Sequence, residues 1–210
     1  MTLIIGSEGR IGKRYKAVLK NIGESILCCD SQLNNVLEMD QMIEKSDRIL
    51  LCTPTDTHFD LMMKLIPFKK PILCEKPMTK NYDELGQIFQ LASAHGTKVN
   101  MVMQYKEIYR SDKPGQPSYY DYYNHGPDGK YWDTMQVIGL AKGPIKIMEE
   151  SPIWKCMING EEVSFVAMDY AYIKMMTKWI QGNLEQDPDE IIRIHRKVVD
   201  LIDAESNDYE

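Results

Sequence analysis

The chain has 210 residues, of which 43% are hydrophobic and 27% are charged, and its formal net charge is −6. This length can form one large or two small domains, and the composition is typical of a globular protein rather than a disordered, fibrous or membrane-spanning one. The negative charge argues against a nucleic-acid partner, and the sequence shows neither a signal peptide nor an apolar run of membrane-spanning length.

The cysteines and histidines do not indicate a metal site. The five cysteines, at positions 28, 29, 52, 74 and 156, are odd in number and show no CxxC spacing. Most of the segments around them resemble buried strands, which favours packed, reduced thiols over disulfides or zinc ligands. The four histidines are widely scattered along the sequence. We therefore expect a cytoplasmic protein without a bound metal.

Short apolar runs alternate with helical patterns over the first hundred residues. Strands are predicted at 2–5, 25–29, 48–52, 72–74 and 98–103, and helices at 10–21, 36–45, 57–66 and 82–95. Because the strands are apolar throughout, both faces of the sheet should be covered. Residues 1–110 are thus predicted to form an α/β domain with a doubly wound, Rossmann-like parallel sheet.

The pattern changes at RSDKPGQPS (110–118), whose prolines and glycine indicate a domain boundary. After a tyrosine-rich stretch, a helical pattern at 133–141 and an apolar run at 145–148 are followed by a hairpin signal at Asn159-Gly160. Two helices close the chain, one from Asp169 to near Gly182 and one capped by Asp187. We expect residues 111–210 to form a small α+β domain whose last helix packs back on the first domain.

The first strand leads into a glycine-rich turn, IIGSEGRIG. A turn of this kind before a helix brings backbone N–H groups and the helix N-terminus onto a pyrophosphate. The spacing is GxxGxxG, and in the commoner GxGxxG frame Ser7 would hold the first glycine position. The alternative is that the glycines only permit tight packing of the strand against the helix. On the binding interpretation the phosphate site consists of Gly6, Ser7, Gly9, Arg10, Ile11 and Gly12.

An acidic residue, Asp30, ends the second predicted strand. At this position a carboxylate can accept hydrogen bonds from the adenosine ribose and repel a 2′-phosphate, which favours NAD over NADP. The alternative is that Asp30 only forms a turn before Ser31.

Polar clusters follow the other strands of this domain as well. TPTDTH follows 48–52, EKP follows 72–74, and QYK, which contains Gln104, follows 98–103. The carboxyl ends of parallel strands share one edge of a sheet, and ligands bind at that edge. We therefore expect Glu75 and Lys76 to reach a cofactor cleft.

At this point three segments, GSEGRIG, LLCTPTDTH and ILCEKPMTKNYDEL, together resemble the Gfo/Idh/MocA oxidoreductases. The resemblance covers about residues 2–105 and is looser from 118 to 210. It implies hydride transfer between a nicotinamide cofactor and a sugar, an inositol or a related compound. It also implies that Lys76 stabilises or protonates the substrate oxygen, and that the nicotinamide ribose side is lined by Thr53, Pro54, Thr55, His58 and Glu75. For His58, the alternative is a residue at the helix start that caps its own turn.

The second region departs from the family pattern. Family members carry an aspartate followed four residues later by a histidine; here Asp133 fits the aspartate but Val137 stands at the histidine position. His125 is a candidate replacement as a titrating group, and its alternative is a surface turn residue. The region is also too short for the broad sheet of the family.

Two functions of different classes follow. The favoured one is an NAD-dependent oxidoreductase acting on a small sugar, polyol or sugar derivative, with Lys76, Asp133 and His125 as catalytic residues. The alternative is a non-catalytic nucleotide-binding or protein-interaction protein derived from such an enzyme. A reading as a dihydrodipicolinate-reductase-like protein, suggested by GRIG, lacks the paired-histidine motif. Exposed apolar surface on a reduced sheet would suit a homodimer.

Overall fold

The computed structural model describes residues 1–33, 36–107, 117–120, 135, 147–148, 155–158, 161–162 and 165–207. The chain divides into two units. One joins Met1–Val102 with Met175–Pro188, and the other joins Met103–Lys174 with Asp189–Glu210. The predicted boundary near residue 110 lies outside the described residues, and the packing of the last helix on the first domain stays a prediction.

The first unit is built on a parallel sheet with the strand order β2-β1-β3-β4-β5. Its strands are β1 (Thr2–Ile5), β2 (Ile26–Cys29), β3 (Arg48–Leu51), β4 (Ile72–Cys74) and β5 (Val99–Met101). All five predicted strands are confirmed, some with shorter ends. Because β1 lies between β2 and β3, the direction in which strands are added reverses beside β1. This is the switch point at which open α/β sheets bind ligands.

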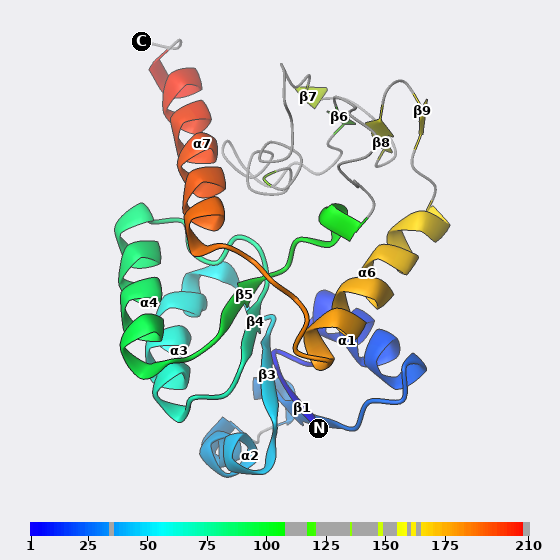
Figure 1. The fold of residues 1–210 in the computed structure, drawn as a ribbon, viewed down its shortest axis with the longest axis vertical. Helices are drawn as coiled ribbons and strands as arrows, with labels where there is room; N and C mark the ends of the chain where they lie inside the picture. The colour runs from blue at the N-terminus through cyan, green and yellow to red at the C-terminus, as the bar shows by residue number, and fades with distance from the viewer. Residues whose placement is uncertain are drawn as a thin grey trace. The chain divides into compact units, whose positions relative to one another are not determined.

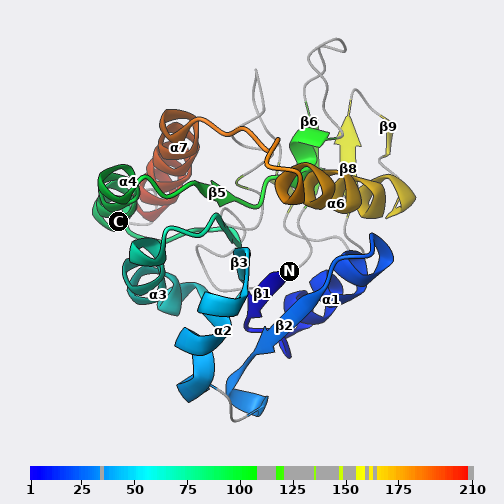
Figure 2. The same ribbon diagram turned by 60° about the horizontal axis from the view of Figure 1, so that its bottom comes forward.

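Helices cover both faces of this sheet. They are α1 (Arg10–Asn21), α2 (Met39–Lys45), α3 (His58–Leu65) and α4 (Tyr82–His95). Helix α1 lies on one face, and α3 and α4 lie on the other (Figures 1 and 2). The central strands β1, β3 and β4 are almost entirely buried, as their continuous apolar sequences predict.

Local signals account for the ends of α4. The Asn81 side chain accepts hydrogen bonds from the N–H groups of Asp83 (2.8 Å) and Glu84 (3.4 Å), as an N-cap residue should. At the other end Gly96 adopts the left-handed conformation (φ 67°), which glycine takes without steric cost. The sequence therefore defines both ends of this helix.

The second unit contains a four-stranded sheet in the order β7-β6-β8-β9. The strands are β6 (Pro117–Tyr120), β7 (Ile147–Met148), β8 (Lys155–Ile158) and β9 (Glu161–Glu162). Antiparallel pairing of Ile158 with Glu161 confirms the predicted hairpin, although residues 159–160 of its turn are not described. Of the helix predicted at 133–141, only Met135 is described, and it is helical.

Two long helices, α6 (Phe165–Ile180) and α7 (Pro188–Asn207), each contribute residues to both units. The predicted start of α6 at Asp169 was wrong, because the helix begins four residues earlier. Residues 165–168 are apolar, and a short apolar run does not distinguish a strand from a helix. Helix α7 begins at the predicted Pro188. No helix in the described part of the chain has the length and apolar character needed to cross a membrane.

Candidate cofactor site

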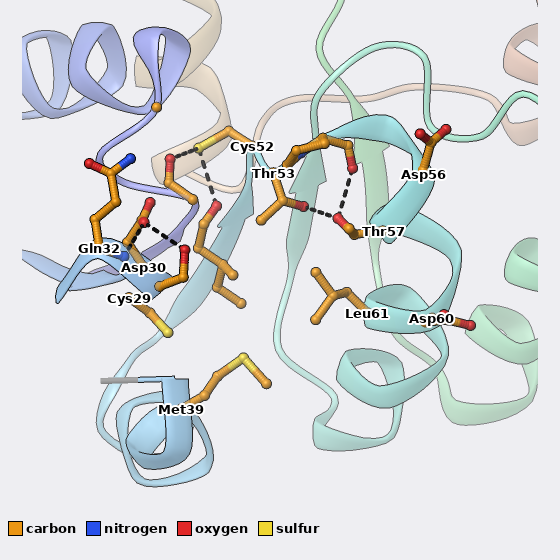
Figure 3. Close-up of a pocket in the computed structure, with 15 residues that line it drawn as sticks. Cys29, Asp30, Gln32, Met39, Cys52, Thr53, Asp56, Thr57, Asp60 and Leu61 are labelled. Carbon is orange, nitrogen blue, oxygen red and sulfur yellow. Dashed lines mark hydrogen bonds between the residues drawn. The ribbon is translucent and has the colours of Figure 1, made fainter. Parts of the chain in front are cut away.

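A cavity of about 560 Å³ lies in the first unit at the carboxyl ends of β1, β2 and β3. Its wall combines the glycine turn, the end of β2, the loop after β3 and one face of α3 (Figure 3). The predicted site residues that line it are Gly6, Gly9, Asp30, Thr53 and Pro54. Three strand ends that are distant in sequence thus meet at the switch point together with the loops that follow them, as the parallel topology requires.

The three glycines of the turn have different roles. A Cβ at Gly6, where φ is +86°, would lie 2.8 Å from backbone atoms of Cys52 and Thr53. A Cβ at Gly12 would lie 2.2 Å from the Gly6 carbonyl oxygen. Both glycines are therefore required by packing, which is the structural alternative considered for the whole turn. At Gly9 the nearest atom would be 3.5 Å away, so packing does not require this glycine, yet it lines the cavity.

Gly9 is also the N-cap of α1 and has no side chain to satisfy the first N–H groups of the helix. The first turn of α1 contains no acidic residue. The N–H groups of a helix N-terminus and the helix dipole favour an anion at such an end. Ser7 is buried, and neither Ser7, Arg10 nor Ile11 lines the cavity.

Asp30 joins the glycine turn to the end of β2. Its Oδ2 accepts a hydrogen bond from the Glu8 N–H (2.8 Å), and its Oδ1 accepts one from the Gln32 N–H (2.9 Å). Burial alone raises the pKa of Asp30, but the hydrogen bonds from Gln32 and Glu8 outweigh it and hold this pKa below the ordinary value. Asp30 is therefore a carboxylate at neutral pH. Asp30 thus orders the turn that follows β2 and also lines the cavity.

The loop after β3 is ordered by its own hydroxyl groups. Thr57 Oγ1 donates to the Pro54 carbonyl at 2.7 Å and lies 2.7 Å from Thr53 Oγ1. Thr53, Pro54 and Thr57 line the cavity, whereas the predicted Thr55 does not.

Sequence reasoning missed the contribution of α3 and α2 to the wall. The residues concerned are Asp56 and Thr57 in the short helical turn before α3, Asp60 and Leu61 in the first turn of α3, and Met39 at the start of α2. The spacing of 56, 57, 60 and 61 places these side chains on one helical face, a signal that was present in the sequence. Leu61 and Met39 present apolar groups from two sides of the hollow (Figure 3).

The charged side chains on the wall are all acidic: Asp30, Asp56 and Asp60. Asp56 lies 3.6 Å from the Lys80 ammonium group, but both side chains are largely exposed, so solvent screens the attraction between them. No lysine or arginine lines this cavity. A ligand that carries an extra phosphate at this wall would therefore add its charge to that of carboxylates.

The EKP segment after β4 lies at the same edge of the sheet but not on the cavity wall. The Glu75 side chain is buried, and its Oε1 accepts a hydrogen bond from the Tyr15 hydroxyl. Its Oε2 accepts one from the Lys76 N–H at 2.9 Å. Lys76 is half-buried, while Glu75 and Pro77 on either side of it are buried. Glu75 and Lys76 are adjacent in sequence, but the acid is buried and the base is partly exposed.

His58 is buried behind the cavity. Its Nδ1 lies 3.0 Å from the Pro77 carbonyl oxygen, and its Nε2 lies 2.8 Å from the Thr53 carbonyl oxygen. Burial lowers the pKa of His58, although the hydrogen bonds to Thr53 and Pro77 oppose this shift. His58 does not line the cavity. Its two ring nitrogens face the loop after β3 and the EKP segment. The contact with Thr53, five residues earlier, is close to the alternative role of a residue that caps its own turn.

The remaining predicted residues lie elsewhere. Gln104 belongs to the second unit, is buried, and donates from Nε2 to the Tyr172 hydroxyl oxygen at 2.9 Å. Asp133 and His125 lie outside the described residues, as does Val137. Among the residues that are described, no group of three His, Cys, Asp or Glu side chains could hold a metal ion.

Comparison with known proteins identifies the fold. Residues 17–103 match the model of the Gfo/Idh/MocA oxidoreductase family, described as an NAD-binding Rossmann fold. This match confirms the resemblance inferred from the sequence. No curated protein matches the chain.

Several solved structures share this fold. A Gfo/Idh/MocA family oxidoreductase from Vibrio cholerae has a TM-score of 0.75 and 11% identity, covering 99% of this chain and 98% of that one. The WlbA (WbpB) dehydrogenase from Thermus thermophilus, in complex with NAD and UDP-GlcNAcA, has a TM-score of 0.65 and 14% identity, with coverage of 96% and 94%. A putative myo-inositol dehydrogenase from Sinorhizobium meliloti 1021 has a TM-score of 0.65 and 14% identity, with coverage of 94% of both chains.

Proposed function

We propose that this chain, whose residues 17–103 match the NAD-binding Rossmann fold of the Gfo/Idh/MocA oxidoreductases, is an NAD-dependent enzyme of the same type. It transfers a hydride between the nicotinamide and a small sugar, polyol or sugar derivative. The observation that carries the proposal is the cavity at the switch point, with Gly9 on its wall and Lys76 at the same sheet edge.

The wall of the cavity suits the adenosine half of a dinucleotide. Gly9 leaves room for close approach at the N-terminus of α1, where an anion is favoured. Asp30 lines the cavity as a carboxylate, the form that accepts a hydrogen bond from a ribose hydroxyl. Met39 and Leu61 supply the apolar surface that a base requires. The acidic wall supports NAD over NADP, because a 2′-phosphate would add further negative charge.

A bound nicotinamide supplies or accepts the hydride. When a carbonyl carbon is reduced, negative charge develops on its oxygen, which needs a cation or a proton donor nearby. We assign this role to Lys76: in reduction its ammonium group donates a proton from Nζ to the substrate oxygen, and in oxidation the neutral amine accepts the proton of the substrate hydroxyl group. Asp133 and His125 are proposed as further titrating groups on the basis of the sequence alone.

The substrate class is supported by two of the structural neighbours. The Thermus thermophilus dehydrogenase was solved with a nucleotide sugar derivative, and the Sinorhizobium meliloti protein is named as a putative inositol dehydrogenase. We propose a hydroxylated ring substrate for this chain. A homodimer and a location in the cytoplasm are proposed on sequence grounds.

Calorimetric titration with NADH and NADPH tests the cofactor assignment. We expect NADH to bind at least about tenfold more tightly than NADPH, a difference of about 1.4 kcal/mol. Gly9→Trp should abolish binding by filling the cavity. Gly86→Trp is the matched control, because an added Cβ at this glycine of α4 meets nothing within 4 Å. Absence of NADH binding at millimolar concentration, or equal loss in both variants, would contradict the proposal.

A substrate screen tests the chemistry. Myo-inositol and UDP-N-acetylglucosamine are incubated with NAD, and NADH formation is followed by absorbance. Lys76→Ala should lower the turnover of any substrate found by about 10²-fold or more, as loss of a general acid does. NADH affinity should persist, since Lys76 does not line the cavity. Unchanged turnover in Lys76→Ala would overturn the role assigned to this residue.

A further inference from the structure

We propose that Tyr15 and Glu75 form a positioning pair that holds the backbone of Lys76, and that His58 completes this support from the other side. The inference rests on the proposed function, in which Lys76 acts on the substrate oxygen. It assigns to Glu75 a role different from the cofactor contact expected from the sequence.

The carboxylate of Glu75 turns inward and not toward the cavity. Only 8% of this residue is exposed, and both of its oxygens accept hydrogen bonds from the protein. One bond comes from the Lys76 N–H at 2.9 Å, so the carboxylate directly holds the backbone of the residue that follows it. A buried carboxylate is retained only where such partners replace water.

The partner of Glu75 on α1 is equally buried. Tyr15 is 0% exposed, and its hydroxyl group donates to Glu75 Oε1. A hydroxyl group and a carboxylate buried together satisfy each other, and a bond to an ionised acceptor is among the stronger kinds. Gly9, the N-cap of α1, lines the cavity, and Tyr15 lies in the second turn of the same helix, so the N-terminal half of α1 contributes to both the cavity wall and the support of the EKP segment.

His58 supports the other side of Lys76. Its Nδ1 lies 3.0 Å from the carbonyl oxygen of Pro77, the residue after Lys76. The Glu75 N–H, in turn, donates to the Leu51 carbonyl of β3 at 2.8 Å. The backbone is therefore held by β3 at Glu75, by the Glu75 carboxylate at Lys76, and by His58 at Pro77.

Support of this kind should affect chemistry more than cofactor binding. A catalytic group loses rate steeply when it moves by about 1 Å, because the reacting atoms leave the productive geometry. Neither Tyr15 nor Glu75 lines the cavity, so their replacement leaves the cofactor wall intact. We expect Tyr15→Phe, which removes only the hydroxyl oxygen, to lower kcat while NADH affinity and KM change little.

The test combines Tyr15→Phe, Glu75→Gln and the double variant with hydrogen exchange measured by mass spectrometry. In each single variant the amide of Lys76, read from peptides that span 75–79, should exchange about tenfold faster, the equivalent of one lost hydrogen bond. The double variant should exchange no faster than the more affected single one, since both changes break one unit. Glu75→Gln keeps the test usable should Tyr15→Phe not fold.

Thr97→Val is the matched control. This change also removes one buried hydroxyl group, because Thr97 Oγ1 donates to the Ile66 carbonyl oxygen at 2.7 Å. Thr97 precedes β5 and therefore lies at the amino ends of the strands, away from the EKP segment. Exchange at 75–79 and kcat should stay at wild-type values in Thr97→Val. Equal exchange at 75–79 in Tyr15→Phe and Thr97→Val, or additive effects in the double variant, would overturn the proposal. Because exchange needs no substrate, a failure of the oxidoreductase assignment would show separately, as absent NADH binding.

Discussion

The side chain of Gln186 forms both backbone hydrogen bonds that a neighbouring strand would offer to Met101. Gln186 Oε1 accepts from the Met101 N–H at 2.7 Å, and Gln186 Nε2 donates to the Met101 carbonyl at 2.6 Å. Met101 belongs to β5, the last strand of the sheet in the first unit. An exposed edge strand invites pairing with another chain, so the amide group of Gln186 both stabilises and protects this edge.

We expect Gln186→Ala to lower the free energy of unfolding by about 1–3 kcal/mol, because two backbone groups of β5 lose their partners. Gln90→Ala, on the exposed surface of α4, is the control and should change it by less than about 0.5 kcal/mol. Urea titration followed by circular dichroism measures both. A change in Gln186→Ala no larger than that of the control would show that water satisfies these groups equally well.

Two alanine substitutions in the glycine turn should show which glycine is required by packing. Gly12→Ala places a Cβ 2.2 Å from the Gly6 carbonyl oxygen and should lower the free energy of unfolding by about 3 kcal/mol or more. Gly9→Ala finds its nearest neighbour at 3.5 Å and should stay within about 1 kcal/mol of the wild type. Thermal unfolding compares them. Similar melting temperatures for the two variants would refute the division of roles in the turn.

Asp30 should make stability depend on acidic pH. Its pKa in the folded chain lies below the ordinary value of 3.8, so folding favours the carboxylate. This contribution is fully present above pH 3.8 and is lost as the pH falls through the lower pKa of the folded state. The free energy of unfolding of Asp30→Asn should therefore differ most from the wild type at neutral pH, with the difference shrinking in acid. A gap that stays constant from pH 7 to about 3 would contradict the assignment.

The thiols of β2 should differ sharply in reactivity although they are adjacent in sequence. Cys29 is buried, and burial together with the Asp30 charge raises its pKa, whereas Cys28 is half-exposed. Burial likewise raises the pKa of Cys52 and of Cys74. Since the thiolate is the reactive form, iodoacetamide should modify Cys28 in the native protein and the other three only after unfolding. Mass spectrometry maps the sites, and rapid native modification of Cys74 would be the contrary result.

The strand ends that form the site could be predicted from the sequence, because local patterns decide them. A strand apolar on both faces, followed by a helix, belongs in a parallel sheet, and a parallel sheet collects its carboxyl ends at one edge. The structure brings Gly9, Asp30, Thr53 and Pro54 to the wall of one cavity for this reason, and their contact with a cofactor stays a prediction. The start of α6 was missed because its first residues are apolar and lack a capping signal, so nothing local separates them from a strand.

The sequence by itself determined the sheet, its strands and the edge at which polar groups gather, because these depend on periodicity and turn chemistry within a few residues. Only the tertiary structure decided which glycine leaves room for a ligand and where Glu75 points. Both depend on atoms far away in sequence, since Gly6 packs against Cys52 and Glu75 meets Tyr15 sixty residues earlier. The parallel register that pairs Ile5 with Leu51, and Leu51 with Cys74, brings these segments together.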